Sequence, residues 1–185
     1  METLDQYLTT VRRTTSVAFV KQEPRRFLLK RPSKRCNSDA QLEQISFQTV
    51  LAKADVDPFA SEWRVVPIQK REGNPYEDRI SIGRASNCDI VLRLPFISKV
   101  QAHIFRDSDG AYSLRAQNTA NPTTVNNHLV DADAICPLKV GDVIAFGPMK
   151  FEFVDAARFH NVLTTEIHGG LAAGMTRPTR STNQP

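Results

Sequence analysis

Three polar side chains with the chemistry to hold a phosphate fall in one part of the chain. Arg84 offers a planar fork of N–H donors, Ser98 a hydroxyl and Lys99 an ammonium within one local segment. Guanidinium, hydroxyl and ammonium groups bind the oxygens of a phosphate group well. These residue types therefore predict a site for a dianion.

Short β-branched runs flank these residues and must position them. Ile80 and Ile82 alternate with polar residues before Gly83, and residues 90–92 form a second apolar run. Similar runs follow at short intervals, separated by Gly, Pro, Asn and Asp, and the last two flank a Gly-Pro pair as a closing hairpin. Strands this short and frequent favour an all-β sandwich of two antiparallel sheets over βαβ units.

Five sequence pieces occur in an order that carries a family resemblance. They are Gly83-Arg84, Asp89-Ile90, Ser98-Lys99 followed by Ala102 and Ile104, the segment 121–126, and the segment 138–147. Together they resemble the forkhead-associated (FHA) domain, a module that reads phosphothreonine, over roughly residues 63–154. The resemblance implies an FHA-like β-sandwich whose loops bind a phosphopeptide.

The resemblance also implies a role for each site residue. Arg84 would bind the phosphate through two parallel N–H groups, Ser98 through its hydroxyl or backbone N–H, and Lys99 through its charge. Asn121 would hold the main chain of the peptide. The loops offer further possible peptide contacts at Val100, Ala120 and Thr123.

Three residues depart from the family pattern. Gln101 stands where the family has a His that helps hold the Ser98 loop, and Ala120 stands where a Thr or Ser often contacts the peptide backbone. Pro122 replaces a Gly and fixes φ near −65°. These departures motivate an alternative, a degenerate FHA scaffold that mediates phospho-independent protein–protein interaction.

Each site residue also has a purely structural interpretation. Arg84 could pair with a surface carboxylate such as Asp89, and Ser98 and Lys99 could be ordinary turn residues. Asn126 is best interpreted as a turn former, because Asn tolerates the left-handed region. We expect Asp89 to order the loop after Arg84 and not to touch a ligand.

Composition and missing motifs exclude several function classes. The sequence has no P-loop, HExxH, Gly-x-Ser-x-Gly or paired Cys/His pattern, so we expect no enzyme, no cofactor and no small-molecule substrate. Its three cysteines show no metal or disulfide spacing, which predicts reduced thiols and no metal. The chain has no run of eighteen apolar residues and no apolar leader, so we expect a cytoplasmic protein without a membrane span.

The rest of the chain divides into extensions around the domain. Residues 1–60 predict an N-terminal extension with a short amphipathic helix and a basic arm, followed by the FHA domain over 61–155. Residues 156–168 predict a short C-terminal helix, and 169–185 a disordered tail. Residues 27–29 predict a brief strand or, alternatively, an apolar peg, that is, a short apolar segment that packs on the domain. The segment around 44–51 fits the pattern of a strand or of a helix. Nucleic-acid binding by the basic arm is unlikely, because aromatic residues are sparse there.

Thr14 and Thr15 suggest a second, regulatory hypothesis. They lie in the hydroxyl-rich stretch Thr-Thr-Ser-Val, which is similar to the phosphorylated N-terminal motif of small bacterial FHA regulators of metabolism. A Ser/Thr protein kinase would phosphorylate one of them, and the domain would then capture it in cis. In the structural alternative these hydroxyls only belong to a polar helix end.

The sequence as a whole predicts a bacterial-type signalling adaptor. Its partner would be a Thr-phosphorylated protein or peptide in a Ser/Thr kinase pathway.

Overall fold

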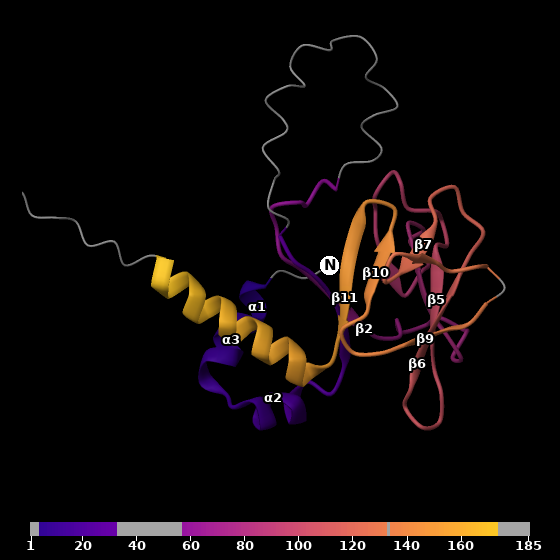
Figure 1. The fold of residues 1–185 in the computed structure, drawn as a ribbon. Helices are drawn as coiled ribbons and strands as arrows, with labels where there is room; N and C mark the ends of the chain where they lie inside the picture. The colour runs from indigo at the N-terminus through magenta and orange to yellow at the C-terminus, as the bar shows by residue number, and fades with distance from the viewer. Residues whose placement is uncertain (1–3, 33–56, 133, 174–185) are drawn as a thin grey trace, which may run out of the picture.

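A computed structural model describes residues 4–32, 57–132 and 134–173, and within them two facing sheets form a sandwich (Figure 1). The first sheet has the strand order β2-β1-β11-β10-β7-β8. Its strands are β1 (Arg26–Lys30), β2 (Arg64–Ile68), β7 (Thr123–Val125), β8 (His128–Leu129), β10 (Val143–Phe146) and β11 (Met149–Val154).

The second sheet has the order β4-β3-β5-β6-β9. Its strands are β3 (Ile80–Gly83), β4 (Ile90–Val91), β5 (Ala102–Arg106), β6 (Tyr112–Ala116) and β9 (Cys136–Leu138). The β3–β4 pair is parallel, whereas the other pairs in the two sheets are antiparallel. The predicted all-β sandwich is therefore confirmed, including the closing β10–β11 hairpin.

The main core lies between the two sheets and follows the period of two along the strands. Met149, Phe151 and Phe153 of β11 point into it and are almost completely buried, and Ile104 of β5 faces them from the second sheet. Lys150 and Glu152 alternate with these residues and are less buried, as expected where one face of a strand packs on a core.

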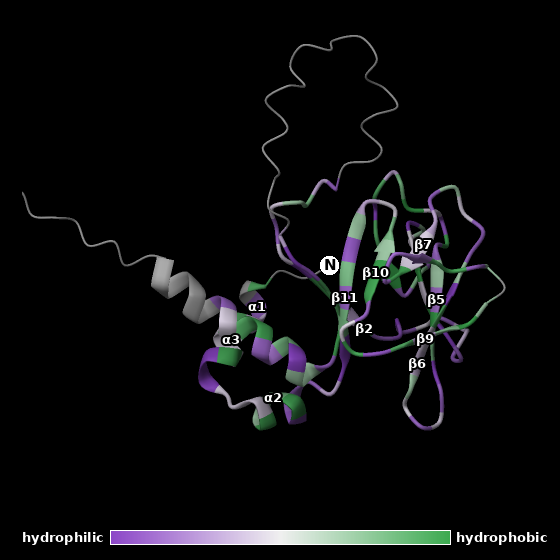
Figure 2. Ribbon diagram, viewed as in Figure 1, coloured by the Kyte–Doolittle hydropathy of each residue, from purple (hydrophilic) through white to green (hydrophobic). Residues whose placement is uncertain are grey.

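Three helices cover the outer face of the first sheet near β1, β2 and β11. They are α1 (Asp5–Arg13), α2 (Ser16–Gln22) and α3 (Ala156–Ala173), and they lie together on one side of the sandwich (Figure 1). We call them the helical lobe. Their apolar residues, which are green in Figure 2, form a second core with Phe27, Leu29 and Val154 of the sheet.

Strand β1 is apolar on both faces because it lies between the two cores. Leu28 faces the interior of the sandwich, whereas Phe27 and Leu29 face the helical lobe, and all three are buried. The ring of Phe159 from α3 lies 4.7 Å from the ring of Phe27 and 5.0 Å from that of Tyr7. Such aromatic contacts add to the free energy gained by area burial.

The end of β1 is anchored by a buried lysine. Only 2% of the Lys30 side chain is exposed, and its Nζ donates to the carbonyl of Phe59 at 2.6 Å. The same ammonium pairs with the Asp57 carboxylate at 2.9 Å. A buried ammonium needs such partners, so Lys30 fixes the chain where it returns at 57–62 to enter β2.

The structure differs from the predicted bounds of the N-terminal and C-terminal extensions at two places. The predicted N-terminal helix corresponds to α1, and residues 27–29 belong to β1, which pairs with both β2 and β11. The boundary drawn at residue 61 thus separates two paired strands. Helix α3 continues to Ala173, beyond the predicted end at 168. Residues 44–51 and the tail from 174 onward lie outside the described residues.

Candidate functional site

A close backbone contact joins the turn after β3 to the Ser98-Lys99 segment. The Arg84 N–H donates to the carbonyl of Ser98 at 2.8 Å, and the Ala85 N–H donates to that of Lys99 at 3.1 Å. A Cβ on Gly83 would lie only 2.2 Å from the Lys99 oxygen, so only glycine allows the two segments to meet. The Gly83-Arg84 pair therefore places the guanidinium beside Ser98 and Lys99.

The Arg84 side chain is oriented by one hydrogen bond and keeps most of its donors. Its Nε donates to the carbonyl of Ile97 at 3.0 Å, and the side chain is exposed. Within the described part of the chain, its two terminal nitrogens have no hydrogen bond and no ion pair. The alternative pairing of Arg84 with Asp89 is not found, because Asp89 pairs with Lys70 instead.

Asp89 orders the framework behind this turn, as expected. Its carboxylate is completely buried and accepts hydrogen bonds from the Ser81 N–H and hydroxyl, both at 2.7 Å, and from the Arg71 N–H at 2.9 Å. Burial by itself would raise the pKa of Asp89. The bonds from Ser81 and Arg71, together with the Lys70 ammonium, outweigh burial and hold this pKa below its ordinary value.

Gln101 connects the two loops that carry the other site residues. It is completely buried, and its Oε1 accepts the Ser98 N–H at 3.0 Å. Its Nε2 donates to the Asn121 carbonyl at 2.8 Å and lies within hydrogen-bonding distance of the hydroxyls of Thr119 and Thr123. Gln101 therefore supports the Ser98 loop through its amide, although the family has a His at this position.

This network corrects part of the role expected for Ser98. Its backbone N–H is already donated to Gln101, so only the Ser98 hydroxyl remains for a ligand. Thr123 is 1% exposed, and its hydroxyl lies 3.1 Å from Nε2 of Gln101. Val100 and Ala120 are exposed, as peptide contacts require.

Asn121 joins its own loop to the loop that carries Ser98 and Lys99. Its Nδ2 donates to the carbonyl of Phe96 at 2.8 Å, and its Cβ lies close to Gly147 at the tip of the β10–β11 hairpin. Within the described residues its Oδ1 makes no hydrogen bond, so it can accept one from a peptide N–H. We call Arg84, Ser98, Lys99 and Asn121, with the loops that carry them, the loop cluster.

Thr14 and Thr15 occupy helix ends in the helical lobe. The Thr14 hydroxyl donates to the Thr10 carbonyl at 2.7 Å, and the Thr14 carbonyl lies 3.1 Å from Nε2 of His160. The Thr15 oxygen accepts the Ala18 N–H at 3.3 Å as the N-cap of α2. Capture in cis would require these residues to leave the helix ends that they now stabilise.

Asn126 adopts the turn conformation expected of it. Its φ is 52° and that of Asn127 is 66°, and these two residues form the tight turn between β7 and β8. The side chain of Asn126 also bonds to Asp142 and to the Val143 N–H.

Sequence reasoning did not identify Lys70 and Thr119 as parts of the framework. Both act through neighbours that are distant in sequence, so no local motif marks them. The ranges that the structure describes contain no helix long and apolar enough to cross a membrane. They also contain no group of three or more His, Cys, Asp or Glu side chains that could hold a metal ion.

The family model for the FHA domain matches residues 80–147, which include β3 to β10 and the loop cluster. The chain therefore contains an FHA domain, in agreement with the resemblance of its motifs. No curated protein matches the chain.

Solved FHA domains are similar to this chain. The MEK1 FHA domain in complex with a HOP1 phosphothreonine peptide is 26% identical, with coverage of 50% of this chain and 88% of that chain and a TM-score of 0.39. The FHA domain of CT664 from Chlamydia trachomatis is 20% identical, covering 70% and 97%, with a TM-score of 0.45. The N-terminal FHA domain of Rad53p from S. cerevisiae, in complex with a phosphothreonine peptide, is 18% identical, covering 54% and 90%, with a TM-score of 0.43.

Proposed function

We propose that this protein is an adaptor that binds phosphothreonine peptides through its loop cluster and recruits Thr-phosphorylated proteins in Ser/Thr kinase signalling. The observation that carries the proposal is that the Arg84 guanidinium is held in place and still has donors for a ligand. Its guanidinium is exposed and fixed through Nε, and its terminal nitrogens make no bond among the described residues.

The surroundings of Arg84 suit a phosphorylated side chain. A phosphothreonine carries about −1.5 to −2 charges and three acceptor oxygens. The backbone contacts of Gly83 and Arg84 bring the Ser98-Lys99 segment against the Arg84 turn, and in this proposal the Ser98 hydroxyl and the Lys99 ammonium bind the same phosphate. Asn121 retains an acceptor for the main chain of the peptide.

The rival proposal of a degenerate scaffold rests on Gln101, Ala120 and Pro122. Gln101 no longer favours it, because the amide makes the loop-to-loop bonds that a supporting residue must make. Ala120 and Pro122 are exposed loop residues.

A titration with matched peptides tests the proposal. Threonine and phosphothreonine versions of peptides from an oriented library are titrated against the native protein and the Arg84→Ala and Arg84→Lys variants. A charge-assisted hydrogen bond contributes about 1.5–3 kcal/mol, so Arg84→Ala should weaken phosphopeptide binding at least about tenfold. Arg84→Lys should restore only part of the affinity, because Lys lacks the planar fork.

Arg106→Ala is the matched control. It removes the same charge from an exposed position at the far end of β5, and should leave affinity nearly unchanged. Equal binding of the two peptide forms, or full affinity in Arg84→Ala, would contradict the proposal and favour the degenerate scaffold.

A further inference from the structure

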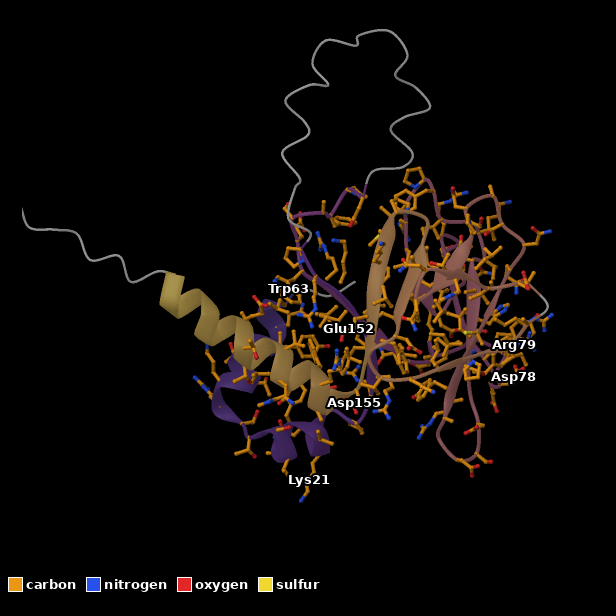
Figure 3. The ribbon with its side chains drawn as sticks, in the orientation of Figure 1. Lys21, Trp63, Asp78, Arg79, Glu152 and Asp155 are labelled. Atoms are coloured by element: carbon orange, nitrogen blue, oxygen red, sulfur yellow. The ribbon has the colours of Figure 1, made fainter. Side chains whose placement is uncertain are left out.

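A cavity of about 500 Å³ opens beside the loop cluster. The loop between β2 and β3 and the turn between β3 and β4 form its walls, and outward-facing residues of β3 and β5 contribute to its lining. Its lining residues include Arg71, Tyr76, Arg79, Cys88, Val100 and His103. Figure 3 shows Arg79 and Asp78 at the side of the sandwich away from the helical lobe.

The wall formed by the β2–β3 loop is held in place by buried and bridging bonds. The Lys70 ammonium donates to the carbonyls of Arg79, at 2.6 Å, and of Tyr76, which closes the loop on itself. The buried Asp89 carboxylate binds the Arg71 N–H, and the Arg71 guanidinium donates to the Ser86 carbonyl across the cavity wall. The cavity is thus formed before any ligand binds.

The cavity borders directly on the loop cluster. Val100 follows Lys99 and lines the cavity with 36% of its surface exposed. The Cys88 thiol, which also lines the cavity, donates to the carbonyl of Lys99 at 3.3 Å. An extended peptide advances about 3.3 Å per residue, so a ligand held at Arg84 can place a nearby side chain in the cavity.

The donors in the cavity suit a carboxylate. Arg71 bonds through one terminal nitrogen only, and Arg79 binds Asp78 through Nε and one terminal nitrogen, with its guanidinium carbon 5.2 Å from the Tyr76 ring centre. Among the described residues, the remaining N–H groups of both side chains have no partner. A bidentate acceptor would satisfy them.

Among the described residues, the Arg71 guanidinium has no carboxylate partner, whereas the acidic groups next to it are mostly paired. The Asp89 charge is compensated by Ser81, Arg71 and Lys70, and Asp78 is paired with Arg79. Glu72 lines the cavity too, but it is exposed, where solvent screens its repulsion.

His103 lines the cavity, so its pKa can report on a charge bound there. Burial, then the positive charges of Arg79 and Arg115, lower the pKa of His103, and the opposing effects of Asp78 and Asp89 are smaller. A carboxylate bound beside it would therefore raise the pKa of His103.

We propose that this cavity is a second subsite of the phosphopeptide site, which takes an Asp or Glu side chain a few residues from the phosphothreonine and binds it through Arg71 and Arg79. This inference rests on the proposed phosphothreonine binding. It assigns to this chain a sequence preference that the loop cluster alone does not supply.

A positional scan of phosphothreonine peptides tests the subsite. Asp and Glu replace Ala at each position within four residues of the phosphothreonine, with Asn and Gln as uncharged isosteres. One position should prefer the acid about threefold to fivefold, the range expected of a partly exposed ion pair. The Arg71→Gln and Arg79→Gln variants should lose this preference while still discriminating phosphothreonine from threonine.

Two further measurements separate recognition from a structural effect. Arg71→Glu should reverse the preference, so that Lys at the same position binds better than Asp. NMR titration of His103 should show a higher pKa with the acidic peptide than with its amide isostere. Arg93→Gln, at an exposed position that does not line the cavity, is the control and should keep the native preference.

The outcomes distinguish the two proposals. Phosphothreonine-dependent binding without an acidic preference, with a preference for apolar residues, or with an acidic preference that survives in the Arg71 and Arg79 variants would overturn the subsite alone. Absence of phosphothreonine-dependent binding would overturn the proposed function and the subsite with it.

Discussion

The helical lobe and the loop cluster are built from opposite kinds of contact. The lobe buries aromatic rings such as Phe19, Phe27 and Phe159, all at 0% exposure, against one face of the first sheet. The loop cluster is joined by hydrogen bonds from the backbone, from the buried amide of Gln101 and from Asn121, and its cations face solvent. The difference teaches that apolar packing holds the helical lobe in place, whereas polar contacts hold the loops that we propose bind the phosphopeptide.

Truncation of an aromatic ring in the helical lobe should test this separation with the largest effect. Phe159→Ala removes the ring that contacts Tyr7, Phe19 and Phe27, and should lower the free energy of unfolding by about 3–5 kcal/mol. Urea unfolding measures the loss. Phosphopeptide affinity, measured by titration at a temperature where the variant stays folded, should be unchanged, and a weakened affinity would show that the two regions are coupled.

Truncation of Gln101 should change both stability and binding. Gln101→Ala leaves the Ser98 N–H without its buried partner and leaves the Asn121 carbonyl with the Thr119 hydroxyl as its remaining donor, so we expect a loss of about 1–3 kcal/mol in the free energy of unfolding. Phosphopeptide affinity should fall as well, because the loops lose their common support. Gln22→Ala, which truncates an exposed glutamine at the end of α2 in the helical lobe, is the control. Native affinity in Gln101→Ala would mean that the loops hold their positions without it.

Acidification should produce the smallest effect and should act through Asp89. Because its pKa in the folded protein is lowered, Asp89 contributes stability above its unfolded pKa of about 3.9, and this contribution is lost as the pH falls through the folded value. Urea unfolding between pH 6 and pH 3 should show this loss. Asp89→Asn should flatten that part of the profile, whereas an unchanged pH dependence would assign it to other carboxylates.

The sequence predicted the parts of the site that local rules determine. Gly83 and Arg84 form a short motif, and the structure gives the steric reason for the glycine. Asp89 was expected to order its loop, and it accepts hydrogen bonds from Ser81 and Arg71. These roles could be predicted because each residue belongs to a motif of fixed spacing, although the partners of Asp89 lie 8 and 18 positions away.

The pairing of β1, the bonds of Gln101 and the cavity depend on contacts between residues that are distant in sequence, so motifs in the sequence could not predict them. The apolar run at 27–29 fitted a strand or a peg, because its partners in β2 and β11 lie far along the chain. The bonds of Gln101 to Thr119, Asn121 and Thr123 depend on how two loops approach each other. The cavity beside Arg71 and Arg79 depends on how the β2–β3 loop folds over the sheet.

The place of β1 in the first sheet has a consequence for synthesis on the ribosome. Phe27 pairs with Pro67 of β2 on one side and with Val154 of β11 on the other. The first strand of the described chain therefore completes its pairing only after the last strand has been made. Until β11 emerges, one edge of β1 is free to pair with another nascent chain. The ion pair between Lys30 and Asp57 needs only residues that are made before β11, so it can join the end of β1 to the returning segment during that interval.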